Sequence, residues 1–408
     1  MTATVATIFA VVYLGMILGG LPFLQLDRTG VALLGAIALV GLEVLTPEQA
    51  ALSIHLPTLL LLFSFMVISA QMRLGGFYTW VTLRIASLPL APPALLAAIM
   101  AAVAALSAVF SNDVVCLAVA PVLADACVRR RLDPVPYLVA LACAANLGSA
   151  STLIGNPQNM LIGQVLDLHF AAYLREAIAP VLLGLAASWA IIAWQMRGER
   201  VALPDPAVTE RRAEPGQQLD RWQTAKGLAV AATLVAVFLF TSWPREVAAL
   251  TGAGILMMSR KLHSNKMLGL VDWELLILFI GLFVVNHAFA ATGLSAGAMR
   301  ALAASGLPLA DPAPLFATTF VLSNVVSNVP AVMLLLPAAT EPFSGPMLAL
   351  VSTLAGNLLI VGSIANIIVV DAARRRGIAI DWRRHARTGI PVTFATLAIT
   401  AGWFALRS

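Results

Sequence analysis

Long apolar runs recur along the whole of this chain. Spanning candidates lie near residues 4–24, 29–46, 55–73, 134–165 and 170–196, and again near 224–242, 245–260, 272–292, 344–370 and 388–406. A run of about 20 apolar residues can cross a hydrocarbon core of ~30 Å as one helix. The chain is also 60% hydrophobic and only 11% charged, unlike a soluble domain. We therefore predict an all-α, multi-pass membrane protein with about ten transmembrane helices.

Two further apolar segments, 92–128 and 311–340, are each interrupted by a Ser-Asn pair. Ser111-Asn112-Asp113 and Ser327-Asn328-Val329 match at an offset of 216 positions, and a proline follows eight residues after each triplet. A polar side chain left unsatisfied at this depth costs several kcal/mol. Each arm is short for a full crossing, so both segments predict re-entrant hairpins.

Two further sequence similarities extend the repeat along the chain. Residues 32–36 resemble 249–253 at an offset of 217, and residues 88–93 resemble 307–312 at an offset of 219. We therefore predict two repeats, 1–196 and 224–408, joined by a polar linker at 197–223. Because each repeat has an odd number of crossings, five, the second enters the membrane from the opposite side, which gives inverted topology.

The basic residues set the orientation. With the N-terminus outside, 21 of the 25 Lys and Arg residues fall on one side of the membrane. By the positive-inside rule that side is cytoplasmic. This predicts a bacterial inner (plasma) membrane protein with a cytoplasmic linker and with both termini periplasmic. The same distribution explains the net charge of +5, and no nucleic-acid-binding module is recognisable, so no nucleic-acid partner is expected.

Each hairpin is followed by an apolar segment, 134–165 or 344–370, that small and polar residues interrupt. Gly155-Asn156-Pro157-Gln158-Asn159 in the first segment matches Gly362-Ser363-Ile364-Ala365-Asn366 in the second. This pattern predicts a discontinuous helix in each repeat. Close packing through small residues is the alternative, but it does not explain the recurring asparagines Asn146, Asn156, Asn357 and Asn366.

Hairpin tips and helix breaks that meet at mid-membrane predict a shared ligand site. Helix N-termini attract anions, hydroxyl and amide groups bind a polar substrate, and freed carbonyls coordinate Na⁺. Helix capping alone is the alternative for the tips. The predicted substrate-binding residues are Ser111, Asn112, Asn156, Ser327, Asn328 and Asn366. The predicted ion-coupling residues are Asp113, Asn146, Gly148, Ser149, Thr152, Asn357 and Ser363.

Asp113 is the only carboxylate at either tip, since Val329 occupies the matching position. It has three candidate roles: helix N-cap, Na⁺ ligand or proton carrier. His287, in the segment before the second hairpin, is a candidate proton-binding residue, with a satisfied structural histidine as the alternative. The three cysteines have no paired spacing. No cofactor or metal is therefore expected, apart from Na⁺ as the coupling ion.

These motifs resemble the ion-transporter superfamily of arsenite permeases, citrate/Mg²⁺ carriers, D-type Na⁺/H⁺ antiporters and divalent anion:sodium symporters, and above all its YbiR-type inner-membrane permeases. The resemblance implies a scaffold, a moving transport region with two hairpins, and a homodimer working by an elevator motion. In the anion:sodium symporters each tip reads Ser-Asn-Thr and touches Na⁺ and substrate carboxylates. Carried over, Ser111-Asn112 and Ser327-Asn328 serve these roles, while Asp113 and Val329 replace the threonines.

The expected function is secondary active transport of a small anion or oxyacid, coupled to Na⁺ or H⁺, by alternating access. The substrate is a carboxylate such as citrate or an inorganic oxyanion. A negative Asp113 repels a carboxylate, which favours a neutral ligand such as arsenous acid, an inorganic oxyanion, or proton coupling. Arsenite efflux, Na⁺/H⁺ antiport and an ion channel are the alternatives. No H-E-x-x-H or Walker A string occurs, so an enzyme is not expected.

Overall fold

The computed structural model describes residues 1–21, 24–197 and 218–407, which form helices and one short hairpin of strands. The first half contains α1 (Thr2–Leu18), β1 (Gly20–Leu21), β2 (Leu26–Asp27), α2 (Arg28–Gly41), α3 (Pro47–Ser53), α4 (Leu56–Leu74), α5 (Phe77–Ala86), α6 (Pro92–Val109), α7 (Asn112–Arg129), α8 (Pro134–Ala150), α9 (Pro157–Val165) and α10 (Phe170–Met196). β1 and β2 pair in antiparallel fashion.

The second half runs through a corresponding order of long helices, hairpin and broken helix. It contains α12 (Arg221–Phe240), α13 (Arg245–Met257), α14 (Ser264–Leu268), α15 (Trp273–Ala291), α16 (Leu294–Ala304), α17 (Pro312–Val326), α18 (Asn328–Leu335), a 3₁₀ turn (Leu336–Ala338), α19 (Ser344–Ala355), a second 3₁₀ turn (Ile360–Gly362), α20 (Ile364–Arg375) and α21 (Trp382–Ala405). α4 and α15 are each followed by a short helix that begins after a left-handed glycine, Gly76 or Gly293.

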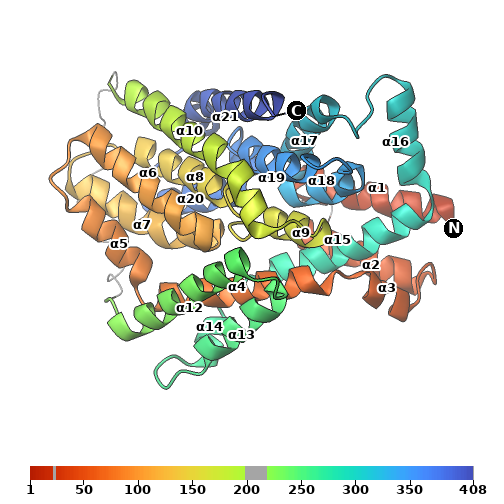
Figure 1. Ribbon diagram of the computed structural model, residues 1–408, viewed down its shortest axis with the longest axis horizontal. Helices are drawn as coiled ribbons and strands as arrows, with labels where there is room; N and C mark the ends of the chain where they lie inside the picture. The colour runs from red at the N-terminus through yellow and green to blue at the C-terminus, as the bar shows by residue number, and fades with distance from the viewer. Residues whose placement is uncertain (22–23, 198–217, 408) are drawn as a thin grey trace.

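Helix contacts repeat with the two halves exchanged. α4 packs against α13, and correspondingly α15 packs against α2. α6 packs against α8 as α17 packs against α19, while the equivalent helices α10 and α21 pack against each other. In Figure 1, α4, α12 and α13 lie along one side, α10 and α21 along the other, and α8, α9 and α19 between them. We call α1–α4 and α12–α15 the frame, and α6–α10 with α17–α21 the hairpin region.

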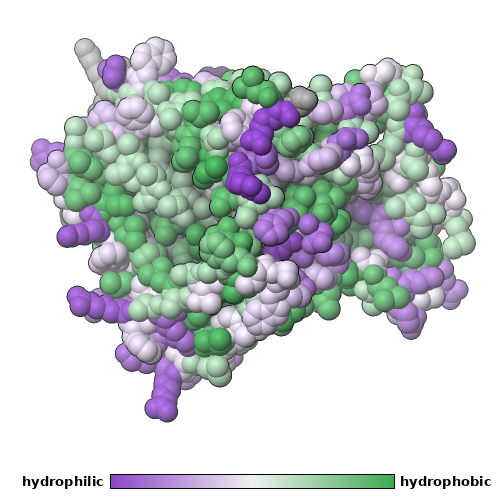
Figure 2. Space-filling model, in the orientation of Figure 1, coloured by the Kyte–Doolittle hydropathy of each residue, from purple (hydrophilic) through white to green (hydrophobic). Residues whose placement is uncertain are grey.

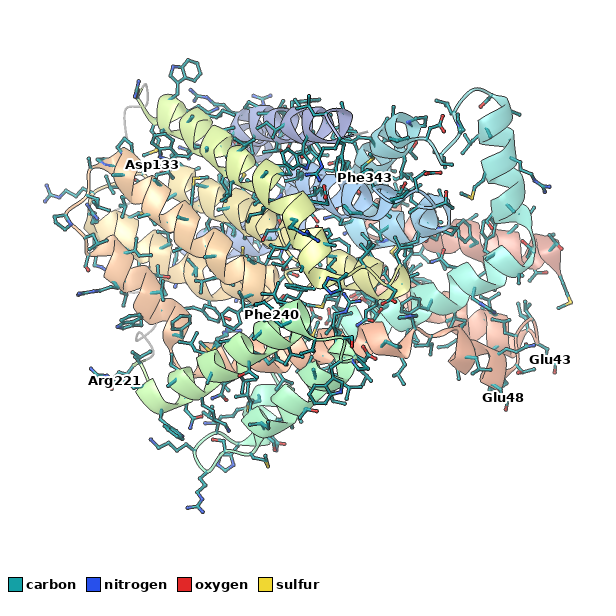
Figure 3. All side chains as sticks on the ribbon, viewed as in Figure 1. Glu43, Glu48, Asp133, Arg221, Phe240 and Phe343 are labelled. Carbon is teal, nitrogen blue, oxygen red and sulfur yellow. The ribbon has the colours of Figure 1, made fainter. Side chains whose placement is uncertain are left out.

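The surface and helix lengths are those of a multi-pass membrane protein. Among the described residues, six helices are long and apolar enough to cross a membrane: α4, α6, α10, α12, α15 and α21. The prediction that each hairpin arm is short for a crossing was therefore wrong for α6, which has 18 residues. Hydrophobic residues cover much of the face in Figure 2. Asp133 and Arg221 lie toward one end of the long axis in Figure 3, and Glu43 and Glu48 at the other. The predicted set of about ten crossings also needs the shorter helices α1, α2 and α13 and the two broken helices.

Hairpins and broken helices occur within the predicted segments. α6 and α7 meet at Phe110 and Ser111, and α17 and α18 meet at Ser327. The first broken helix is interrupted between Ala150 and Pro157, and the second between Ala355 and Ile364. We call these two interruptions the first and second break. α20 continues to Arg375, beyond the predicted end at residue 370.

Several predicted boundaries were wrong, for local reasons. α1 ends at Leu18 rather than residue 24, because Gly19 takes a left-handed conformation with φ 82° and stops the helix. α5 and α16 were not predicted, since at 10 and 11 residues they are too short to read as spans. α21 begins at Trp382, earlier than the predicted residue 388, because the Asp381 side chain accepts a bond from the Arg384 backbone and caps it.

Most of the predicted linker, 197–223, lies outside the described residues. Where the chain is described again, Asp220 caps α12 by accepting hydrogen bonds from the backbone N–H groups of Gln223 and Trp222. The bond from Gln223, with Lys261 nearby, holds the pKa of the Asp220 carboxyl below its usual range. α12 therefore starts at Arg221, inside the stretch predicted as linker.

Candidate functional site

Each hairpin tip lies against the break of its own half. The Asn112 backbone N–H donates to the Gly155 carbonyl at 3.1 Å, and the Thr152 hydroxyl donates to the Ala108 carbonyl at 2.6 Å. In the second half, a Cβ built on Gly356 would lie 3.2 Å from the Asn328 amide nitrogen. Each tip thus packs against the break of its own half.

The two breaks are held by asparagines at matching positions. The Asn159 amide donates to the carbonyls of Ser149 and Thr152, which are ten and seven residues upstream. The Asn366 amide donates to the carbonyls of Gly356 and Leu359, again ten and seven residues upstream. An interrupted helix leaves carbonyls without intrahelical partners, and these amides satisfy two in each break. Asn366, predicted to bind substrate, therefore uses its nitrogen to hold the second break.

Hydrogen bonds also cross between the halves. The Ser363 hydroxyl donates to the Asn146 side-chain oxygen at 3.0 Å, and the Asn156 amide donates to the Thr353 hydroxyl at 3.3 Å. These two contacts are equivalent, because Asn146 precedes Asn159 by as many residues as Thr353 precedes Asn366. Each break is thus bonded to the first arm of the other broken helix, and the two halves form one polar network.

Asn146 is the centre of this network. Its side-chain oxygen also accepts from the Asn112 amide at 3.3 Å, and its nitrogen donates to the Asn357 side-chain oxygen at 2.8 Å. The Asn357 backbone carbonyl lies 3.1 Å from the His385 imidazole. Both Asn357 oxygens therefore have hydrogen-bond partners, and Asn357 links the two halves.

The remaining predicted residues of the first break have structural contacts. The Ser149 hydroxyl donates to the Asn146 carbonyl and accepts from the Asn156 amide. Gly148 faces the Ala104 backbone, which a Cβ would meet at 2.2 Å, so only glycine permits this approach of α8 to α6. Gly148, Ser149 and Thr152 thus shape the first break by packing and bonding.

Capping explains one of the predicted residues but not the tips. Asn156 caps α9 by accepting from the Asn159 backbone at 2.9 Å. Ser111 and Ser327 occupy N-cap positions, yet their side chains make no capping hydrogen bond. Asp113 lies in the first turn of α7 rather than at the cap, where the helix dipole favours its charge. The capping alternative for the tip residues was therefore wrong.

Matching polar atoms at the two hairpins lack partners. Among the described residues, no hydrogen bond reaches the side-chain oxygens of Asn112 and Asn328, or the hydroxyls of Ser107 and Ser323, although all four are buried. Ser107 and Ser323 are 216 positions apart, the offset of the tips themselves. A buried polar atom without a partner costs about 1–3 kcal/mol, so its repetition in both halves indicates a role outside the fold.

The site segments contain no basic side chain. Residues 92–128, 134–165, 311–340 and 344–370 include no Lys, Arg or His. The groups available to a ligand are therefore amides, hydroxyls, carbonyls, helix N-termini and the Asp113 carboxylate. A multivalent anion would meet no formal positive charge from these segments.

Known proteins place the chain in a family. Residues 12–355 match the citrate transporter family, CitMHS. The chain belongs to this family.

The chain is similar to transporters over nearly the full length of both sequences. The silicon efflux transporter LSI3 of Oryza sativa subsp. japonica is 28% identical over 464 residues, covering 96% of this chain and 95% of that one. An uncharacterized transporter of Mycobacterium tuberculosis is 28% identical over 416 residues, covering 94% of each chain. The YdaH transporter of Alcanivorax borkumensis superposes with a TM-score of 0.53 at 14% identity, covering 99% of this chain and 97% of that one, which shows a shared fold alone. Family and relatives point to a transporter rather than an enzyme.

Several residues of the network were missed from the sequence. Ser107 and Ser323 were recoverable, because a serine one turn before each tip recurs at the offset of 216. Asn159 was recoverable as the partner of Asn366. Thr353 was not, because its counterpart is the chemically different Asn146. Tyr173 and His385 were also missed, and they are considered below.

Proposed function

We propose that this family member is a secondary active transporter for a small oxyacid or anion, coupled to Na⁺ or H⁺. The observation that carries the proposal is the matched pair of partnerless oxygens at each tip, from Ser107 and Asn112 and from Ser323 and Asn328. Such acceptors suit the hydroxyl groups of a polar substrate or a desolvated cation.

Within that class, a neutral oxyacid fits better than citrate. The site segments supply no basic side chain, and Asp113 adds a carboxylate at the first tip. Asp113 lies in the first turn of α7, and a proton or Na⁺ would neutralise its carboxylate most simply. The name of the relative LSI3, a silicon efflux transporter, supports silicic acid as a first substrate to test, with arsenous acid as the second.

The mechanism proposed is alternating access in a bacterial inner membrane with both termini periplasmic. The exchanged contacts of α4 with α13 and α15 with α2 support two repeats of inverted topology. The hairpin region would move against the frame as a unit. A homodimer is proposed from the family resemblance alone, and light scattering of the detergent-purified protein tests it.

Transport into proteoliposomes tests the proposal. Silicic acid, arsenous acid, citrate and succinate are supplied with Na⁺ or choline, with and without a pH gradient. We expect saturable transport and counterflow of a neutral oxyacid that Asn112→Ala and Asn328→Ala both abolish. Neither tip oxygen accepts a bond, and Asn112→Ala loses only the 3.3 Å bond from its amide to Asn146, so both variants should remain folded. Asn265→Ala, at an exposed asparagine of α14, is the matched control.

Four outcomes would correct the proposal. Normal transport by both tip variants would show that the site is elsewhere. Sodium-dependent citrate uptake would restore the carboxylate alternative despite Asp113. Large ion currents without saturable counterflow would indicate a channel. Na⁺/H⁺ exchange without any oxyacid would indicate an antiporter on the same scaffold.

A further inference from the structure

The two breaks are each contacted by the fourth residue of the following long helix. In the first half this is Tyr173 of α10, whose hydroxyl donates to the Ala150 carbonyl at 2.6 Å. In the second half it is His385 of α21, whose Nε2 lies 3.1 Å from the Asn357 carbonyl. Ala150 and Asn357 are equivalent, because each precedes its break asparagine, Asn159 or Asn366, by nine residues. Tyr173 and His385 therefore contact equivalent carbonyl groups in the two halves.

Both side chains are buried, with 1% of Tyr173 and 2% of His385 exposed. A carbonyl accepts, so the imidazole must hold a proton on Nε2 in either charge state. Gly389, one turn further along α21, allows the close approach, since a Cβ there would lie 2.5 Å from the Asn357 carbonyl oxygen. The contact is therefore built into the packing of α21 against the second break.

The histidine is connected to the first hairpin tip. The Asn357 side chain accepts from Asn146, whose own oxygen accepts from the Asn112 amide. His385 therefore contacts Asn357, Asn357 is bonded to Asn146, and Asn146 is bonded to Asn112 at the tip that carries Asp113. A change in the bond between His385 and Asn357 can reach the first tip through these two side chains. Tyr173 has the corresponding position but is bonded to Asn159 in addition.

The helices packed against α21 offer the ring no titratable partner in the network. α19 carries no ionisable side chain. Asp133, at the N-cap of α8, pairs with Arg384, and Glu176 of α10 pairs with Arg407. The other ionisable groups on these elements are Tyr137 and Cys143 of α8, Tyr173 and Arg175 of α10, and Arg383 and Arg387 of α21 itself. A change in the charge of the ring therefore acts mainly on its hydrogen bond to the Asn357 carbonyl.

We propose that His385 is a positioning residue that makes the second break respond to protons, while Tyr173 holds the first break regardless of pH. The inference rests on the proposed transport function and adds a residue to it. A phenol stays neutral up to pH ~10, whereas an imidazole gains its charge between about pH 5 and 8. Charge-assisted hydrogen bonds are about twice as strong as neutral ones, so protonation changes how firmly α21 holds the break.

The transport test compares wild type with His385→Gln and His385→Tyr at equal pH on both sides of the vesicle. Gln keeps an N–H donor without a charge, and Tyr reproduces the first half. Because burial lowers the pKa of His385 below its usual value, we expect the wild-type rate to change about fivefold through a single-proton step on the acidic side of pH 6.5. Both variants should lose the step while still transporting. His169→Gln, at an exposed histidine that caps α10 without a side-chain bond, should keep the step.

A second measurement decides the proposal even if no tested substrate is transported. Hydrogen exchange of the backbone amides in residues 356–364, corrected for intrinsic rates, is followed over the same pH range. Opening of this segment should depend on pH in wild type and not in His385→Gln, while residues 151–156 show no such difference. Wild-type pH dependence that persists in both His385 variants overturns the proposal; absence of transport in wild type with a pH-dependent second break overturns only the proposed function.

Discussion

The first break, between α8 and α9, has bonded polar groups, whereas the second, between α19 and α20, has several without partners. Asn156 caps α9 and is itself bonded to Ser149 and Thr353. At the second break Ser363 makes no capping bond. Among the described residues, the Asn357 nitrogen and the side-chain oxygens of Asn366 and Asn324 have no partner. The two breaks therefore have equivalent positions, but the polar groups are hydrogen-bonded at the first break and several remain available for new hydrogen bonds at the second.

The two hairpins show the same contrast, because the first makes stronger polar contacts than the second. α7 is fastened to α20 by a buried ion pair, Asp125 to Arg376, at 2.9 Å. α18 carries no charged residue, and its N-cap Ser327 has φ 77° and ψ 160°, a conformation nearly restricted to glycine. The ion pair therefore makes the first hairpin part of a rigid unit. Backbone strain and polar atoms without hydrogen-bond partners are concentrated at the second hairpin and its break. We infer that the second hairpin makes the larger rearrangement when ligand binds.

The largest expected effect comes from breaking the fastening of the first hairpin. Asp125→Asn leaves Arg376 as an unpaired buried charge and should lower the free energy of unfolding by about 3–5 kcal/mol. Chemical denaturation in detergent measures it. Asp371→Asn is the control, because the exposed pairs of Asp371 with Arg374 and Arg375 are worth under about 1 kcal/mol. Equal losses in the two variants would contradict a rigid first unit.

Next in size is removal of the link between the halves. Asn146→Ala deprives Asn112, Asn357 and Ser363 of their shared partner, which should cost about 2–4 kcal/mol and abolish transport. Ser352→Ala is the matched control on α19, since its hydroxyl bonds only to the Ala349 carbonyl one turn away. Full transport by Asn146→Ala would show that the two breaks work independently.

Strain at the second tip gives a smaller effect of opposite sign. Ser327→Gly should raise the free energy of unfolding by up to about 1 kcal/mol, because glycine adopts positive φ without penalty. Ser111→Gly at the first tip, where φ is −55°, should lower it instead. Thermal melting of both variants measures the difference, and shifts of the same sign would remove this contrast between the tips.

No loss of stability is expected at the partnerless serines. Ser107→Ala and Ser323→Ala break no hydrogen bond within the protein and remove an unpaired buried hydroxyl, so the free energy of unfolding should stay the same or rise by about 1 kcal/mol. Ligand affinity should nevertheless fall in both. Ser64→Ala, which removes a local bond to the Leu60 carbonyl in α4, should leave affinity unchanged. A destabilisation above 2 kcal/mol would mean that these serines serve the fold.

Sequence reasoning located hairpins and breaks because glycine, proline and Ser-Asn pairs are visible inside apolar runs. It placed Asn112, Asn146, Asn156 and Ser363 near one another, and the structure joins them. It could not assign their bonds, because the matching positions carry chemically different residues: Asn146 corresponds to Thr353, and Tyr173 corresponds to His385. The short helices α5 and α16 were missed because hydropathy detects only segments long enough to span.

The most direct test is the thermal stability of the purified protein against silicic acid, arsenous acid and citrate, each in Na⁺ and in choline. A ligand that binds only the folded state raises the melting temperature by mass action. If both tips form one site, a neutral oxyacid should stabilise wild type and Asn265→Ala but neither Asn112→Ala nor Asn328→Ala. A wild-type-sized shift that survives in either tip variant would contradict a site shared by the two hairpins.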